Sequence, residues 1–398
     1  MIVLAIAATE DMEIYVGLPR VLWHDPKIAR HVRLLKALYG LKQAGKLWNE
    51  TINRFLCSIG SKRCLSNVCL YVHSDTDLPH LYICVYVDDI LIVAVRQEDI
   101  DWVKGELVRE FEKMKLPGPI KRFLGLKFKR RTILVTQEEY IKKIVKKNLT
   151  PGTRTAAIPG NPAVNLHTAE RGVGSLQSEV GQLCYSADRV RSDTLAAVNL
   201  LSKVATCPSP EHIKASYKVF QYLKGTAADG LTLGGEGPIV AVAYCDASFI
   251  AESDSKSQYG YAIHLSRKAG AVITKAKSVT HVHHHPSEAD TYAVDEGCKE
   301  IEWVRLILEE LEYPQKAPIV INTDSASTID TVSITGNFQR QKQYNRNINY
   351  IRELIANNVV VLNHISGDEQ HTDMLTKNLA VQKHSKFKKR MMQSLDDI

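Results

Sequence analysis

Two runs of apolar, largely β-branched residues stand out in the first third of the chain, and a pair of acids separates them. The first run is Leu81–Val87, the second is Ile90–Val95, and Asp88 and Asp89 lie between them. Short, continuous runs of this composition are typical of buried strands. We therefore predict a β-hairpin with both carboxylates at its tip. A membrane span fits poorly, because the two charges would lie in mid-bilayer at a cost of several kcal/mol.

The same reasoning predicts the other elements. Apolar positions three to four residues apart favour helices, whereas short β-branched runs favour strands. The predicted helices span 34–48 (with a break at Gly40), 98–114, 179–185, 191–202, 211–225 and 288–303. The predicted strands span 13–16, 239–246, 257–265, 271–274, 319–324 and 359–365, and 133–144 is typical of a strand followed by a helix.

Loops rich in proline and glycine divide the chain. Thr150-Pro-Gly, Ile158-Pro-Gly and Asn161-Pro mark a linker after the first third. We predict an α/β (α+β) protein of four segments: 1–150, a helical segment 151–237, a segment 238–380 and a basic tail 381–398. The third segment has the order βββαβαβα, with acids at the ends of its strands.

Composition limits the cellular compartment and the class of partner that we expect. The net charge of +7 is compatible with a polyanionic partner. The eight cysteines are scattered, without a Cys-x-x-Cys pair, which favours reduced thiols inside a cell. The N-terminus lacks the basic start of a signal peptide, and the chain contains no run of 18 apolar residues, so we expect neither secretion nor a membrane partner.

The acid pair at the hairpin tip suggests a metal. A packed core does not accept two bare carboxylates unless a cation pairs with them. Mg²⁺ prefers oxygen ligands and usually takes one or two carboxylates together with substrate phosphates. The alternative is a surface hairpin whose Asp88–Asp89 turn is simply solvated.

Several motifs resemble those of one family. Tyr86-Val-Asp-Asp89 resembles the catalytic turn of reverse transcriptases, and Leu38–Ala44 followed by Trp48 resembles a polymerase helix of Ty1/copia-type retrotransposons. Phe123–Gly125 and Tyr244–Ser248 extend the resemblance, which covers about residues 13–380. It implies a reverse transcriptase palm and thumb followed by a ribonuclease H domain. It also implies contacts with nucleotide or template at these residues: Tyr39, Gly40, Lys42, Gln43 and Tyr86.

The last third resembles the ribonuclease H fold, which implies a mixed five-stranded sheet. The family's acidic tetrad maps onto Asp246, Asp290, Asp324 and Asp373, which would hold two Mg²⁺ or Mn²⁺ ions for phosphodiester hydrolysis. Relatives carry Glu at the position of Asp290, one methylene longer. Glu288 lies about 200° round the helix from Asp290 and should point elsewhere.

The resemblance also predicts an impaired polymerase. A two-metal polymerase needs a third carboxylate besides Asp88 and Asp89. In the family this residue lies on a strand whose position falls upstream of Met1, and Ile2, Val3 and Leu4 do not replace it. We therefore expect a truncated polymerase. Relatives also carry His and Asp where this chain has Gln343 and Asn345, which favours decay.

Two features fall outside the family pattern. His281, His283 and His285 would share one face of a strand and could bind Zn²⁺, but a surface loop is the preferred interpretation, since no partner ligand has a metal-site spacing. The basic stretch from Lys383 to Arg390 is expected to be a solvated helix or frayed end, with a nucleic-acid arm as the alternative.

Together these observations predict a retrotransposon-derived RNA-directed DNA polymerase, truncated and impaired, with a ribonuclease H domain that cleaves RNA in RNA–DNA hybrids. The implied partners are an RNA template, a DNA primer, the hybrid and, for a competent polymerase, dNTPs. The implied location is a cytoplasmic virus-like particle or the nucleus. The competing prediction is a catalytically dead relic or a module that binds nucleic acid without cutting it.

Overall fold

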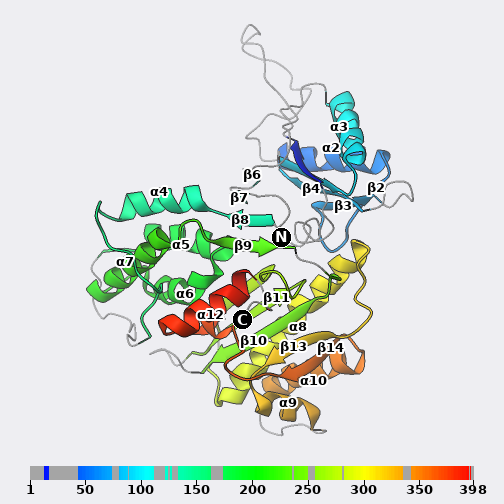
Figure 1. The fold of residues 1–398 in the computed structure, drawn as a ribbon. Coiled ribbons are helices and arrows are strands. Elements are labelled where there is room, and N and C mark those ends of the chain that lie inside the picture. The colour runs from blue at the N-terminus through cyan, green and yellow to red at the C-terminus, as the bar shows by residue number, and fades with distance from the viewer. Residues whose placement is uncertain are drawn as a thin grey trace. The chain divides into compact units, whose positions relative to one another are not determined.

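The computed structural model describes residues 13–17, 44–73, 80–87, 89–111, 122–123, 126–127, 133–162, 174–234, 237–249, 256–279, 282–334, 342–393 and 395 (Figure 1). These residues form two compact units. The smaller unit takes 13–17, 44–123 and 305–314, and the larger unit takes the other described residues. The boundary near residue 125 lies inside the first predicted segment, and the four predicted segments themselves stay a prediction.

The smaller unit is an antiparallel sheet with two helices. Its strands follow the order β1-β5-β4-β3-β2. The strands are β1 (Glu13–Gly17), β2 (Ser61–Arg63), β3 (Leu70–His73), β4 (Leu81–Tyr86) and β5 (Asp89–Ala94), with a short β6 (Arg122–Phe123) further along. The helices are α2 (Ala44–Ser58) and α3 (Gln97–Glu110). The predicted hairpin is confirmed, because β4 pairs with β5 and Tyr86 lies opposite Asp89.

A hydrophobic core holds this hairpin. Ile83 and Ile92, which face each other across the two strands, are fully buried against Leu56 of α2 and Val103 of α3. The predicted helix over 34–48 is described only from Ala44 onward, so its first part lies outside the described residues.

In the larger unit, strands from distant parts of the chain pair with one another. β7 (Leu126–Lys127), β8 (Ile133–Thr136) and β9 (Gly230–Leu233) are neighbours in that order, and Ile133 lies opposite Leu233. Between β8 and β9 the chain forms helices. They are α4 (Glu138–Asn148), α5 (Gln177–Arg189), the 3₁₀ turn η1 (Ser192–Thr194), α6 (Leu195–Val204) and α7 (Pro210–Gly225). As predicted, α7 ends at Gly225.

The rest of the larger unit is the mixed five-stranded sheet that the sequence predicted. Its order is β12-β11-β10-β13-β14, in which β10, β13 and β14 run parallel and the other pairs antiparallel. The strands are β10 (Val242–Ser248), β11 (Gln258–His264), β12 (Ile273–Ser278), β13 (Ile319–Thr323) and β14 (Val360–His364). The helices are α8 (Pro286–Glu310), α9 (Ala326–Ser333), α10 (Lys342–Ala356), α11 (Asp373–Thr376) and α12 (Val381–Met392). Two helices, not the single predicted one, thus connect β13 to β14.

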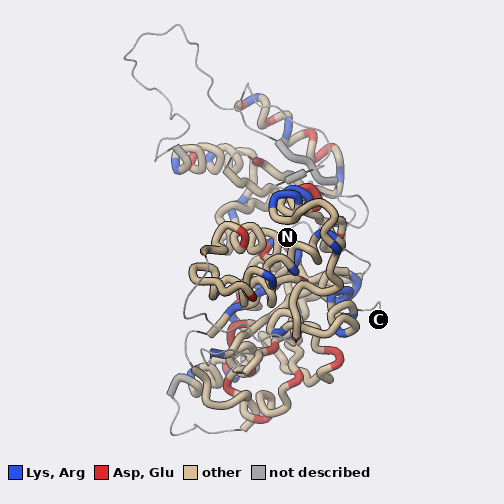
Figure 2. The backbone as a smooth tube through the Cα atoms, turned by 90° about the vertical axis from the view of Figure 1, so that its left-hand side faces the viewer, with Lys and Arg blue, Asp and Glu red and all other residues tan. Residues whose placement is uncertain are grey.

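The C-terminal helix α12 is more than the solvated helix or frayed end that its charge suggested. Blue stretches of the backbone near the C-terminus in Figure 2 mark lysine and arginine positions, but Phe387 and Met391 are fully buried. Both belong to the same core as α4–α7 and the neighbouring strand residue Ala276. Apolar residues four apart give a helix one buried stripe even where the residues between them are lysines and arginines.

A buried ion pair ties α12 to the helices of the middle segment. Arg191 is fully buried, and its Nε and Nη2 donate to the two carboxylate oxygens of Asp193 at 2.9 and 2.8 Å. Tyr222 of α7 donates to the same carboxylate at 2.5 Å, and His384 of α12 lies 3.1 Å from the Asp193 carbonyl. Burial alone would raise the pKa of the Asp193 carboxyl, but the Arg191 guanidinium outweighs it and holds that pKa well below its usual range.

Candidate acidic active site

The hairpin tip of the smaller unit presents only part of the predicted polymerase site. Tyr86 and Val87 are 52% and 59% exposed, and Asp89 is half-buried. Val87 has a φ of 54°, a left-handed conformation that is strained for a β-branched residue. The Trp48 indole N–H donates to the Val87 carbonyl at 2.5 Å and fixes the turn. Asp88, Tyr39, Gly40, Lys42 and Gln43 lie outside the described residues.

The larger unit brings three of the four predicted acids together. Asp246 lies in β10, Asp324 directly follows β13, and Asp373 begins α11. Because β10 and β13 are parallel neighbours, their carboxyl ends meet at one edge of the sheet. One carboxylate oxygen of each of these three residues lies within 4.8 Å of the others. Asp246 and Asp373 are each only 3% exposed, whereas Asp324 is half-buried.

A close approach of α11 to the sheet places the third acid. Gly260 of β11 lies opposite Asp246, and a Cβ at Gly260 would come within 2.8 Å of the Leu375 Cβ in α11. Glycine therefore permits the short helix to lie directly on the strands. In addition, the Thr376 hydroxyl donates to Asp246 Oδ2 at 2.5 Å and orients that carboxylate.

Two lysines contact the acid cluster. Lys377 Nζ lies 2.6 Å from Asp373 Oδ1 and 4.0 Å from Asp246 Oδ2. Lys383 Nζ, from α12, lies 2.5 Å from Asp373 Oδ2. Asp373 thus has an ammonium group on each oxygen, while the carboxylates of Asp246 and Asp324 are less neutralised.

The pKa values reflect burial and crowding of charge. Burial raises the pKa of Asp246 well above its usual value; Lys377 opposes this shift, and the neighbouring Asp373 adds to it. Burial alone would lower the pKa of Lys377, but Asp246 and Asp373 outweigh it and raise that pKa.

Asp290 of α8 lies beside the cluster without joining it. The Ser325 hydroxyl and the Ala247 N–H hydrogen-bond to its carboxylate, and Asp324 acts on it electrostatically. Burial raises its pKa to about 6. Its oxygens are not among those that lie within 4.8 Å of one another, as expected for a side chain one methylene shorter than Glu.

Glu288 has a different role, as predicted from its position on the helix. Its Oε2 accepts a hydrogen bond of 2.8 Å from the backbone N–H of His284, just before α8 begins. This contact satisfies a backbone donor at the helix start, in the manner of a capping residue. Glu288 is therefore engaged away from the acids.

The donor set of the cluster fits a divalent cation. Carboxylate oxygens are the ligands that Mg²⁺ and Mn²⁺ prefer, and buried carboxylates require positive charge nearby. The group of Asp246, Asp324 and Asp373 is the only such set of His, Cys, Asp and Glu ligands found among the described residues. The His segment does not compete with it: 282–285 is not a strand, and His281 lies outside the described residues.

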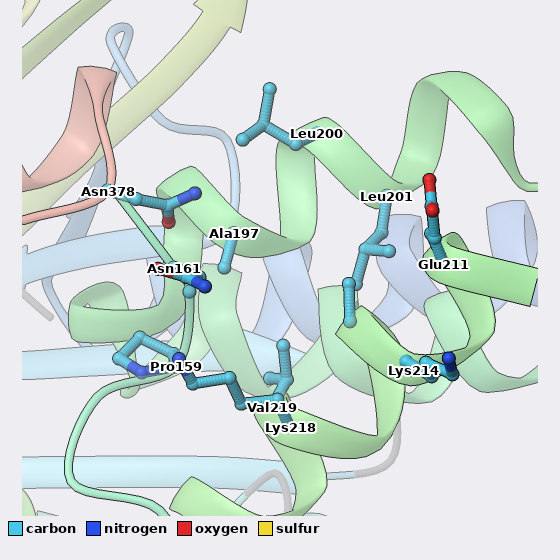
Figure 3. Close-up of a pocket in the computed structure, with 12 residues that line it drawn as sticks. Pro159, Asn161, Ala197, Leu200, Leu201, Glu211, Lys214, Lys218, Val219 and Asn378 are labelled. Atoms are coloured by element: carbon cyan, nitrogen blue, oxygen red, sulfur yellow. The ribbon is translucent and has the colours of Figure 1, made fainter. Parts of the chain in front are cut away.

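A pocket of about 200 Å³ lies against α6 and α7 (Figure 3). Ala197, Leu201 and Val219 form apolar walls, and Asn378 contributes from the segment that follows α11. Gly160 also lines this pocket, and a Cβ at Gly160 would lie 1.8 Å from the Asn378 side-chain oxygen. The pocket contains none of the predicted acids. Lys214 and Lys218 of α7 also line it, while Lys224 at the end of the same helix donates to the Thr153 carbonyl.

Sequence reasoning missed the residues that support the acids. Lys377 is four residues after Asp373, a spacing that brings helical side chains together, and Thr376 directly precedes Lys377. That signal was available. Lys383 and Ser325 carried no such signal, because their contacts depend on how α12 and α8 pack.

Comparisons with known proteins give the following similarities. Residues 4–162 match the family described as reverse transcriptase (RNA-dependent DNA polymerase). The chain is 33% identical over 303 residues to a putative transposon Ty5-1 protein of Saccharomyces cerevisiae, covering 97% of that protein and 74% of this chain. It is 31% identical over 382 residues to the retrovirus-related Pol polyprotein from transposon TNT 1-94 of Nicotiana tabacum, covering 92% of this chain.

The chain spans 28% of the length of that tobacco polyprotein. Among solved structures, a foamy viral protease-reverse transcriptase in complex with RNA/DNA hybrid matches 89% of this chain and 44% of its own, with a TM-score of 0.50 and 12% identity. At that identity, the similarity shows the fold alone. Among the described residues, no helix is both long enough and apolar enough to cross a bilayer.

Proposed function

The chain belongs to the Ty1/copia-type retrotransposon Pol family of reverse transcriptases, and from this premise we propose that its larger unit is a metal-dependent nuclease that cleaves RNA in RNA–DNA hybrids. The observation that carries the proposal is the convergence of Asp246, Asp324 and Asp373 from three separate elements, with carboxylate oxygens within 4.8 Å. An arrangement that costs desolvation and charge repulsion is typical of functional sites.

The residues around the cluster have distinct roles in this proposal. Asp246, Asp324 and Asp373 would hold Mg²⁺ or Mn²⁺, which when bound neutralises charge on the phosphodiester and favours attack by water. Thr376 orients Asp246 through its hydroxyl, while Ser325 and the Ala247 N–H orient Asp290. Asp290, on α8, lies beside this group and adds negative charge near Asp324.

The proposed substrate is the hybrid duplex. The foamy viral protein is in complex with an RNA/DNA hybrid, and we carry that ligand to this chain as part of the proposal. Lys214 and Lys218 on α7 are the proposed phosphate contacts, since Lys224 is engaged by the Thr153 carbonyl. All eight cysteines are free thiols, which is compatible with an intracellular setting for the same activity.

A non-catalytic role is the second candidate, because Asp290 stands where relatives carry Glu and its oxygens do not join the group. A protein that only binds hybrids would bind equally well with Asp246→Asn, and its affinity would depend on salt. The truncated, impaired polymerase stays a prediction, for which primer extension on an RNA template with dNTPs is the direct assay.

Cleavage of a labelled RNA strand within a hybrid separates the two candidates. We expect the purified full chain to cut in Mg²⁺ or Mn²⁺, to stop in EDTA, and to lose cutting with Asp246→Asn. The control is Asp330→Asn, an exposed acid on α9, which should cut as the wild type does. Equal cleavage by Asp246→Asn would assign the activity to another site or a contaminant.

A further inference from the structure

Two lysines lie against the acids that would bind metal, and the proposed function gives them no role. Lys377 approaches both Asp373 and Asp246, at 2.6 and 4.0 Å, from the residue that ends α11. Lys383 approaches only Asp373, at 2.5 Å, from α12. Each carboxylate oxygen of Asp373 therefore has one lysine ammonium group beside it.

The packing of α12 fixes Lys383. His384 lies 3.1 Å from the buried Asp193 carbonyl, and Phe387 is fully buried in the core. The Lys383 ammonium lies 5.1 Å from the Phe387 ring centroid, a cation–π distance. Lys383 thus extends from an anchored helix turn, so its contact with Asp373 is a fixed part of the fold.

Lys377 is placed differently. Its side chain is 42% exposed, against 37% for Lys383, but it approaches two carboxylates, each 4% exposed, whereas Lys383 approaches one. A metal ion bound to Asp246 and Asp373 would need the same oxygens that Lys377 now contacts. The Lys377 ammonium and the metal ion are both positive, so they repel each other, and both interact with the same carboxylate oxygens. Binding of one therefore weakens binding of the other.

We propose that Lys377 is an internal cation that competes with the divalent metal for Asp246 and Asp373, while Lys383 holds the far oxygen of Asp373 in position. The proposal rests on the nuclease site proposed above. Its consequence is a metal threshold: at low metal concentration Lys377 neutralises the acids and keeps the cluster intact, and a bound cation displaces the Lys377 ammonium toward solvent.

Metal affinity gives a direct test that does not depend on cleavage. Isothermal titration calorimetry with Mn²⁺ alone would compare the full-length wild type with Lys377→Gln. Removing the competing charge should tighten Mn²⁺ binding by about tenfold, a typical size for losing one unit charge beside a partly exposed ion site. A lysine that was merely structural would not give tighter binding when removed.

Three further variants make the result specific. Lys377→Arg keeps the charge and should bind Mn²⁺ within about twofold of the wild type. Lys386→Gln is the control for a lost lysine charge, since Lys386 is on α12, as Lys383 is, but donates to the Asp368 carbonyl, and it should leave affinity unchanged. Lys383→Gln should tighten binding less than Lys377→Gln, because Lys383 reaches one oxygen of one acid.

The outcomes are distinguishable. Unchanged or weaker binding by folded Lys377→Gln, with Mn²⁺ bound by the wild type and lost in Asp246→Asn, would overturn the competition and leave the nuclease site standing. No Mn²⁺ binding by the wild type would overturn the site and the competition together. If Lys377→Gln fails to fold, then Lys377→Met, which also removes the charge, decides the matter, and its failure to tighten binding would overturn the proposal.

Discussion

Neutralising Asp290 should stabilise the protein at high pH and have no such effect at low pH. Burial raises the pKa of the folded Asp290 carboxyl from the reference value of 3.8 to about 6. Above pH 6 the carboxyl is ionised in both the folded and the unfolded chain, so the folded state carries the full free-energy cost of burying the charge. As pH falls from about 6 to 3.8 the folded carboxyl takes up a proton first, and the penalty disappears.

The size of the effect follows from the same shift. About two pKa units at about 1.4 kcal/mol each give a penalty of about 3 kcal/mol. Asn keeps one oxygen as acceptor for the Ser325 hydroxyl or the Ala247 N–H and loses the other bond, which costs about 1 kcal/mol. Asp290→Asn should therefore raise the free energy of unfolding by about 2 kcal/mol at pH 8 and lower it by up to about 1 kcal/mol at pH 4, where mainly the lost hydrogen bond remains.

Urea unfolding of the full chain, followed by circular dichroism in EDTA, measures this difference at the two pH values. Asp330→Asn, which removes an exposed acid on α9, is the control and should change little at either pH. Adding Mg²⁺ at pH 8 should stabilise the wild type more than Asp290→Asn and narrow the gap. An equal change at pH 4 and pH 8, or destabilisation at pH 8, would refute the reasoning.

Three further predictions concern the fold around the site. Arg191→Met leaves Asp193 buried without its bidentate partner and should lower the free energy of unfolding by about 3–5 kcal/mol, measured in urea; a loss below about 1 kcal/mol would contradict the buried pair. Glu288→Ala removes a contact at the start of α8 and should cost about 1 kcal/mol while leaving hybrid cleavage intact, whereas lost cleavage in a folded variant would place Glu288 in the site. Burial lowers the pKa of His264 to about 4, so its contribution to stability should be complete above about pH 6.5 and fall as pH drops toward 4; thermal unfolding of His264→Gln should lack this part of the pH dependence.

Local pattern predicted the parts of this protein whose cause is local. The β4–β5 hairpin follows from two β-branched runs around Asp88 and Asp89, whereas the mixed five-stranded sheet was implied by the resemblance to the ribonuclease H fold. The position of Glu288 away from the cluster follows from helix geometry alone. The hairpin and the direction of Glu288 can each be predicted from the side-chain periodicity of a single element.

The remaining features depend on packing between distant segments. Lys383 reaches Asp373 only because α12 docks through Phe387 and Met391, two apolar residues within a strongly basic stretch. Arg191 and Asp193 are two residues apart, but the buried network that they form also contains Tyr222 and His384, which contact Asp193 from other helices. Contacts of this kind leave no pattern within a single segment. The sequence therefore favoured a solvated tail and did not indicate the buried ion pair of Arg191.

The most direct test of the nuclease is cleavage of an RNA–DNA hybrid in Mg²⁺ by the full chain and by Asp290→Glu, with single-stranded RNA of the same sequence as control. The account predicts Mg²⁺-dependent cutting of the hybrid and not of the single strand, and a higher rate for Asp290→Glu, whose longer side chain can join the other acids. Absence of cleavage by both proteins, in Mg²⁺ and in Mn²⁺, would contradict the account.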